Sequence, residues 1–261
     1  ESCGCGQPFS QCPFWSAVGR RAFGGWANLD LDALDADRHA VDRNRYIPFL
    51  ILPRLAPARF RIAHRRHVDV LDRLYAAIDE VATDHGHHSP VLVDSSKHPS
   101  YLFLLRSLQR HRVRLLHVVR DPRGVANSWA REVARPENGE PMEQLGTAKA
   151  IARWTSHNLL FQLAGIVGTP RRRIAYERFT ADPTAIGAAV DDLLSRNPVP
   201  LAIDGADVML GTDHTVSGNP VRFRSGSITI RSDDAWRDTM SPRARRIVGT
   251  FTTPLRQVYS R

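Results

Sequence analysis

Apolar residues recur with two different periods along the chain, and these periods separate expected helices from expected strands. Over residues 64–83 the apolar positions follow the 3.6-residue repeat of an amphipathic helix. The same kind of spacing predicts a long helix over residues 147–166, and an aspartate-proline pair opens a further helix over residues 182–194. A last helix is expected to start near residue 241, because proline is favoured in the first helical turn.

Short, uninterrupted apolar runs predict strands that are buried on both faces. Residues 91–93 (VLV) and 115–119 (LLHVV) are two such runs, and each ends in a group of polar residues. Leucines at helical spacing between them give a crossover of the length that a βαβ unit needs. Residues 173–176 predict a third strand, and a further short strand is expected near Ile228.

The order of these elements predicts an α/β fold with a mainly parallel sheet flanked by helices. At 261 residues the chain fits one domain, residues 1–261, with residues 27–90 forming a mainly helical cap region inside it. The longest apolar run, residues 46–52, is too short to cross a bilayer, and the chain does not open with a signal peptide. We therefore expect a cytoplasmic protein without an integral membrane segment.

Polar residues crowd at the ends of the first two expected strands. In open α/β sheets, ligands bind beyond the carboxyl ends of the strands. Hydroxyl groups, a lysine and an arginine beside helix N-termini favour the oxygens of phosphate or sulfate. We therefore predict an anion site at this edge of the sheet. The residues expected to gather there are Ser95, Ser96, Lys97, Arg120 and Ser128.

The formal net charge of +9 agrees with an anionic ligand but does not identify one. Nearly all of the positive charge is arginine, since Lys97 and Lys149 are the only lysines. A GC-rich coding bias would produce the same composition. No basic run alternates with aromatic residues as it does in proteins that bind single strands, so nucleic acid is not an expected partner.

Three cysteines, Cys3, Cys5 and Cys12, lie close together near the start of the chain. They supply three thiolates, whereas a tetrahedral structural zinc requires a fourth ligand, which the sequence does not place. Reduced cysteines packed in the interior, a metal site and a disulfide are the three alternatives, and we expect the first. The histidines of the DHGHHSP segment, residues 84–90, are expected to lie in a solvated loop.

Five segments resemble segments of the sulfotransferases that use 3′-phosphoadenosine 5′-phosphosulfate (PAPS), especially those of the bacterial branch. They follow the family's order and are spread over most of the chain. The RDPRG sequence followed by a serine is fairly specific, whereas each of the others is weak alone. The five segments are CGCGQPFSQCPFW (3–15), VDSSKHP (93–99), VVRDPRGVANSW (118–129), IAYERFTADP (174–183) and GNPVRF (218–223).

The resemblance implies a P-loop-like fold and a set of residues that bind the donor nucleotide. Arg120 and Ser128 would bind the 3′-phosphate, and Ser96 belongs to the same implied nucleotide site. A structural alternative exists for this turn, in which Asp121 caps a helix and Pro122 takes its first position. Capping and phosphate binding are compatible with each other.

Two further segments are implied to contact the nucleotide. Gly218, Asn219 and Arg222 would close over its 3′-phosphate end. Tyr176 would lie near the adenine, although a tyrosine at the end of a strand also serves to anchor a sheet. Arg222 has the alternative of being a surface arginine in a basic loop.

The implied reaction transfers a sulfuryl group from PAPS to a hydroxyl acceptor and requires no metal. Negative charge builds on the bridging oxygen of the leaving phosphate while the acceptor hydroxyl loses a proton. Lys97 would offset that charge, and His98 would take the proton, with Asp94 as an alternative base. The ordinary alternative for His98 is a surface position that caps the helix beginning at Pro99.

In one respect the chain departs from the family, because the loop that holds the 5′-phosphosulfate has no counterpart before Cys3. The first strand and phosphate loop are thus absent from this sequence, and we expect the chain to be part of a longer enzyme. A non-catalytic module that binds the 3′-phosphoadenosine nucleotide is the alternative. The expected acceptor is a carbohydrate, glycolipid or small alcohol. Trp154, Asn158 and the segment around residues 136–145 could line its pocket, although helix packing explains Trp154 at least as well.

Overall fold

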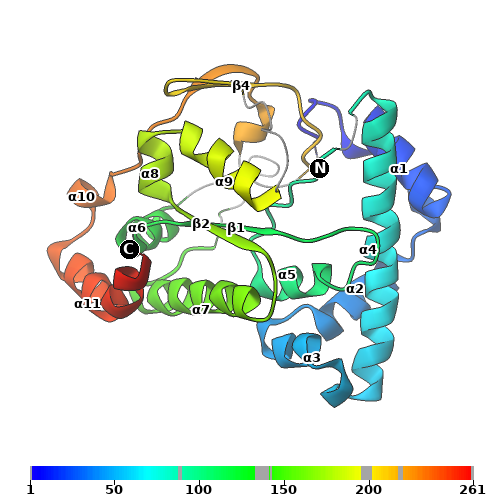
Figure 1. Ribbon diagram of the computed structural model, residues 1–261, viewed down its shortest axis with the longest axis horizontal. Coiled ribbons are helices and arrows are strands. Elements are labelled where there is room, and N and C mark those ends of the chain that lie inside the picture. Colours follow the sequence, from blue (N-terminus) through cyan, green and yellow to red (C-terminus); the bar gives the residue numbers. More distant parts are fainter. Residues whose placement is uncertain are drawn as a thin grey trace. The chain divides into compact units, whose positions relative to one another are not determined.

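The computed structural model describes residues 2–87, 90–132, 141, 143–194, 202–216 and 220–259. The chain divides into two compact units, and each has its own helices (Figure 1) and its own buried residues. The first unit holds residues 1–113 together with 213–218, and the second holds residues 114–212 together with 219–261.

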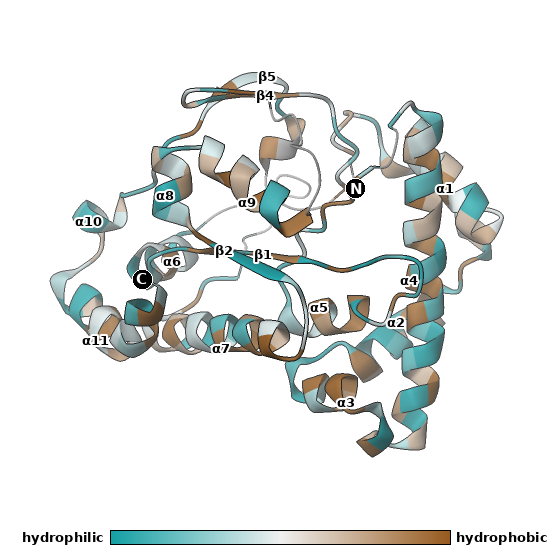
Figure 2. Ribbon diagram, viewed as in Figure 1, coloured by the Kyte–Doolittle hydropathy of each residue, from teal (hydrophilic) through white to brown (hydrophobic). Residues whose placement is uncertain are grey.

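The first unit is helical in its described residues. The helix α4 is 27 residues long and alternates between hydrophilic and hydrophobic positions, as the amphipathic pattern predicts (Figure 2). Both α1 and α2 pack against it. The elements are η1 (Phe9–Gln11), α1 (Pro13–Phe23), η2 (Trp26–Asn28), α2 (Leu31–Val41), η3 (Asn44–Tyr46), α3 (Ile47–Ile51), η4 (Pro53–Leu55), α4 (Ala58–Asp84) and α5 (Pro99–Leu105).

Two apolar clusters hold these helices together. In one, Val18 of α1 packs with Ala77 and Val81 of α4, and both valines are fully buried. In the other, Val41 at the end of α2 meets Phe60 of α4 and Leu104 of α5. Burying a side chain of this size contributes about 1.5–3 kcal/mol, so the amphipathic face of α4 is the organising surface of this unit.

The second unit combines helices with two small sheets. The strands β1 and β2 pair in parallel, and β3, β4 and β5 form an antiparallel sheet in that order. The elements are β1 (Leu115–Val119), α6 (Pro122–Ala130), α7 (Thr147–Ile166), β2 (Arg171–Ala175), α8 (Tyr176–Ala181), α9 (Thr184–Leu194), β3 (Ile203–Asp204), β4 (Asp207–Leu210), η5 (Pro220–Phe223), β5 (Gly226–Thr229), α10 (Trp236–Thr239) and α11 (Pro242–Tyr259).

The parallel pair lies between helices. In Figure 1, α7 runs below the two strands and α9 above them, and α9 contacts both strands. On the α7 side, buried His117 of β1 donates a hydrogen bond from Nε2 to Asn158 Oδ1 at 2.9 Å. The Asn158 amide in turn donates to the carbonyl oxygen of Trp154 at 2.7 Å. A buried polar chain thus ties β1 to α7.

Most expected elements are present. The helices predicted over residues 64–83, 147–166 and 182–194 correspond to α4, α7 and α9, and the predicted C-terminal helix is α11. The strand over residues 115–119 is confirmed, and the strand near Ile228 is β5. The third expected strand begins two residues earlier than predicted, as β2.

The strand predicted over residues 91–93 is wrong. Residues 90–98 are irregular, and Val91 and Val93 are 41% and 87% exposed. A three-residue apolar run becomes a strand only when another strand satisfies its backbone groups, and none of the described residues pairs with it. The expected βαβ unit is therefore not formed, and neither is the sheet-edge geometry that was expected to gather Ser95, Ser96 and Lys97 with Arg120.

The α/β class is confirmed, but the described strands are not mainly parallel, because β3, β4 and β5 are antiparallel. Gly205, with φ of +58°, forms the tight turn between β3 and β4, and glycine adopts this backbone conformation without steric cost. Within the described residues, no helix is both long enough and apolar enough to span a membrane.

The buried His117 predicts a specific pH dependence of stability. Burial, together with the charges of Arg171 and Arg173, lowers its pKa to about 4 from 6.5, although the hydrogen bond to Asn158 opposes this shift. Between these values the unfolded chain binds a proton that the folded protein excludes. Stability is therefore lost as the pH falls from 6.5 towards 4, by about 2 kcal/mol between pH 7 and pH 5.

Urea unfolding at pH 7, 6 and 5 measures this loss in the wild type and in His117→Gln, whose amide keeps a donor near the position of Nε2. The variant is expected to be less stable at pH 7 but to lose about 2 kcal/mol less between pH 7 and pH 5. Carboxylates elsewhere affect both proteins equally. Identical pH dependence in the two proteins would contradict the prediction.

Candidate functional sites

Two of the predicted nucleotide-binding residues meet at the carboxyl ends of the parallel strands. Arg120 follows the last residue of β1, and Tyr176 follows the last residue of β2. Because the strands are parallel and in register, these two positions lie at the same edge. The Arg120 guanidinium lies over the Tyr176 ring at 4.7 Å from the ring centre, which is a cation–π arrangement.

A carboxylate faces Arg120. The Arg120 guanidinium nitrogen Nη2 lies 3.0 Å from Asp233 Oδ2 and also donates a hydrogen bond to the Asp233 carbonyl oxygen at 2.5 Å. Arg131 approaches the other carboxylate oxygen at 3.6 Å, and the Tyr176 hydroxyl accepts a hydrogen bond from the Asp233 amide at 3.3 Å. Although burial acts in the opposite direction, Arg120 lowers the pKa of Asp233. The Asp233 carboxylate thus lies within reach of two arginines.

The helix α6 carries Ser128, the other residue predicted to bind the 3′-phosphate. Asp121 is its N-cap and accepts a hydrogen bond from the Arg123 amide at 2.8 Å, with Pro122 in the first turn, so the capping interpretation is confirmed. A Cβ at Gly124 would lie 3.0 Å from Arg120 Nε. Glycine therefore allows α6 to approach the guanidinium closely. Ser128 is half-buried in the second turn of this helix.

Trp154 and Asn158 pack in the interior. They are only 4% and 8% exposed, and the Trp154 indole donates a hydrogen bond to the Arg120 carbonyl oxygen at 3.1 Å. For Trp154, helix packing is therefore the alternative that is observed. Through this bond α7 fixes the backbone at the end of β1, where the Arg120 side chain begins.

The first predicted turn belongs to the other unit and has a different character. Asp94 accepts hydrogen bonds from the Ser96 amide at 2.8 Å and from the Tyr75 hydroxyl, so it stabilises the turn. Lys97 is exposed and has φ of +64°, the only positive φ among the described non-glycine residues. His98 is the N-cap of α5, but its side chain makes no capping hydrogen bond.

Three further predicted residues lie in the segment 218–223. Gly218 and Asn219 are outside the described residues. Arg222 falls within η5, and only its backbone is described. Their implied role at the 3′-phosphate therefore stays a prediction.

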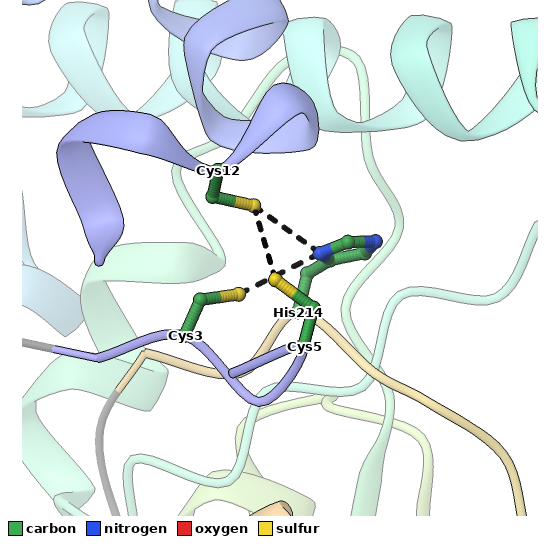
Figure 3. Close-up of side chains that lie close together, drawn as sticks. All are labelled: Cys3, Cys5, Cys12 and His214. Atoms are coloured by element: carbon green, nitrogen blue, oxygen red, sulfur yellow. Dashed lines mark hydrogen bonds between the residues drawn. The ribbon is translucent and has the colours of Figure 1, made fainter. Parts of the chain in front are cut away.

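A cluster of four side chains in the first unit was only partly anticipated. The sequence did not place a fourth ligand beside the three cysteines. In the structure His214, 202 residues after Cys12, could take that place, since the possible ligand atoms of all four residues lie within 4.8 Å of one another. A single histidine in an irregular segment carries no local signal of this role. The members of this cysteine–histidine cluster are Cys3, Cys5, Cys12 and His214 (Figure 3).

The environment of the cluster differs from that of surface thiols. Cys3 and Cys12 are fully buried, whereas Cys5 and His214 are half-buried. Burial raises the pKa of the Cys3 thiol to about 12 and lowers the pKa of His214. The backbone amide of Gln7 lowers the pKa of Cys5. Three sulfur atoms and a neutral imidazole thus share a site that contains no counter-charge among the four residues.

A separate cavity of about 520 Å³ lies in the first unit, within the helical region that was expected to form a cap. Its walls combine aromatic and charged side chains from α3, α4 and the segment after α5, including Phe49, Phe60, Asp72 and Arg110. None of the predicted catalytic or nucleotide-binding residues lines it.

Comparison of the chain with models of protein families, with curated proteins and with solved structures found no match.

The backbone at Lys97 predicts a gain of stability on substitution by glycine. A residue with a side chain in the left-handed region costs roughly 1–2 kcal/mol, which glycine avoids. Part of the stability gained in this way is lost again, because glycine has more conformational freedom in the unfolded chain. Lys97→Gly is therefore expected to stabilise the protein by about 0.5–1 kcal/mol in urea unfolding. Ser95→Gly, at a position with negative φ, is the control and should destabilise it. Destabilisation by Lys97→Gly would show that the lysine side chain makes compensating contacts.

Proposed function

We propose that the protein is a PAPS-dependent sulfotransferase with a P-loop-like fold, which transfers a sulfuryl group to a hydroxyl acceptor and releases adenosine 3′,5′-bisphosphate. The acceptor class is a carbohydrate, a glycolipid or a small alcohol. The unpaired cysteines agree with action in the reducing cytoplasm.

One observation carries the proposal. Arg120, from the most specific motif of the resemblance, and Tyr176, from a second motif, contact each other at the carboxyl ends of adjacent parallel strands. This is the edge where open α/β sheets bind nucleotides. An arginine beside an aromatic ring suits a phosphate next to a base, and Arg131 adds a second positive charge through its contact with Asp233.

The chemical roles follow from charge. As the sulfuryl group leaves, negative charge develops on the bridging oxygen of the phosphate, and the ammonium group of Lys97 offsets it. His98 accepts the proton of the acceptor hydroxyl. The exposed positions of both residues leave their side chains accessible to a ligand. Ser96, Ser128, Gly218, Asn219 and Arg222 complete the nucleotide site in this proposal.

Calorimetric titration with adenosine 3′,5′-bisphosphate tests the nucleotide site. Replacing Arg120 by alanine removes a charge-assisted contact with the phosphate and should weaken binding by roughly 1.5–3 kcal/mol. Replacing Asp233 by asparagine removes the carboxylate that competes with the phosphate and should strengthen binding by about 0.2–1 kcal/mol, the range of an exposed ion pair.

Two further comparisons distinguish a specific phosphate site from a general effect of the protein's charge on nucleotide binding. Arg59→Ala, at an exposed position of α4, is the control for loss of one positive charge and should bind like the wild type. No binding by the wild type, or equal binding by Arg120→Ala, would refute the proposed site.

A sulfate-transfer assay on the complete gene product separates an enzyme from a non-catalytic nucleotide-binding module. Lys97→Ala should reduce the transfer rate at saturating PAPS by more than about 100-fold, as expected for loss of a group that stabilises developing charge. It should leave the affinity for adenosine 3′,5′-bisphosphate nearly unchanged. If the wild type binds the nucleotide but transfers no sulfate to any of the three acceptor classes, the module is the correct alternative.

A further inference from the structure

We propose that the cysteine–histidine cluster binds one zinc ion and that this ion fastens the N-terminal segment to residues 213–216. This proposal does not rest on the proposed function, because none of the four ligands is among the residues assigned to the nucleotide site.

Three of the six distances between the ligand atoms match those of a tetrahedral site, and all six are within 4.8 Å. Around a tetrahedral zinc with Zn–S bonds of about 2.3 Å and Zn–N bonds of about 2.1 Å, two sulfur atoms lie about 3.8 Å apart, and sulfur and nitrogen about 3.6 Å apart. The Cys5 and Cys12 sulfur atoms are separated by 3.7 Å. His214 Nδ1 lies 3.5 Å from the Cys3 sulfur and 3.3 Å from the Cys12 sulfur.

All four side chains point towards a common centre from three separate stretches of backbone (Figure 3). Cys3 and Cys5 come from a loop that is closed by a hydrogen bond from the Cys3 amide to the Gln7 carbonyl oxygen at 2.8 Å. Gly6 has φ of +83°, which completes this turn at a residue without a side chain. Cys12 is the N-cap of α1, where the helix dipole favours a thiolate.

The histidine is held in place by bonds that do not use its ring. The His214 carbonyl oxygen accepts a hydrogen bond from the Trp15 indole at 2.7 Å, and the Gly4 amide donates to the Thr215 carbonyl oxygen at 2.9 Å. The Phe14 ring stacks on the imidazole with ring centres 4.7 Å apart and nearly parallel planes. The orientation of Nδ1 is thus set by its surroundings, as is usual for metal ligands.

The ligand set selects zinc by its chemistry. Thiolates together with an imidazole in tetrahedral geometry suit zinc, whereas calcium and magnesium require oxygen ligands. Four protein ligands fill a tetrahedral coordination sphere and leave no position for water or substrate, so the ion has a structural role. Zinc binding replaces the thiol protons, and the charge of the ion offsets that of the thiolates.

The test is metal analysis of the protein purified under reducing conditions, followed by titration of the metal-free protein with zinc and with cobalt. One zinc per chain is expected, and cobalt should give the visible absorption of a tetrahedral ion with sulfur-to-cobalt charge transfer. His214→Ala and Cys12→Ser should each weaken zinc binding by more than about 100-fold. His85→Ala is the matched control, because His85 also contacts the Phe14 ring but is not in the cluster, and it should bind zinc like the wild type.

Two further measurements keep the result decisive if a variant fails to fold. His214→Cys should retain one zinc and show stronger charge transfer with cobalt, because a sulfur ligand replaces a nitrogen. Chelation of the metal should lower the melting temperature of the wild type, and added zinc should restore it. Purified protein without zinc that also fails to bind added zinc or cobalt would overturn the proposal, as would a disulfide among the three cysteines or wild-type zinc affinity in His214→Ala.

Discussion

Parallel pairing of β1 and β2 is the constraint on which the second unit depends. Two parallel strands cannot be joined by a tight turn, so the chain must leave the sheet and return across it. Here α6 and α7 make that connection, and the buried chain of hydrogen bonds from His117 to Trp154 attaches α7 to β1. Both strands then end at the same edge. The contact between Arg120 and Tyr176, and with it the proposed nucleotide site, is a consequence of this arrangement.

The first unit has no sheet among its described residues and depends on a different principle. Its long helix α4 collects the apolar faces of its neighbours, and a distant segment returns to contact the N-terminal loop. The hydrogen bond from Trp15 to His214 spans 199 residues. Closing so long a loop is entropically costly, and the cost rises only slowly with length. A metal ion shared by both ends would be an efficient way to stabilise such a contact.

Patterns within a few consecutive turns of sequence correctly predicted the long helices. The apolar periodicity of α4 and α7 and the proline at the start of α11 are properties of a few consecutive turns, and these helices lie where they were expected. The run at residues 91–93 has the composition of a strand but no partner, so it remains irregular. Gly205 opens the two-residue turn between β3 and β4, and a glycine at the first turn position of a hairpin is a local signal that the sequence carries.

By itself, the sequence determined the helical framework, the strand β1, the cap of α6 and the motif residues Arg120, Ser128 and Tyr176. Only the tertiary structure decided that Asp233 faces Arg120 and that His214 joins the three cysteines, because both contacts connect segments more than a hundred residues apart. Residue spacing reports which side chains share a helix face or a turn. Contacts between distant segments depend on how those elements pack, and a single histidine or aspartate in an irregular segment gives no local sign of its partner.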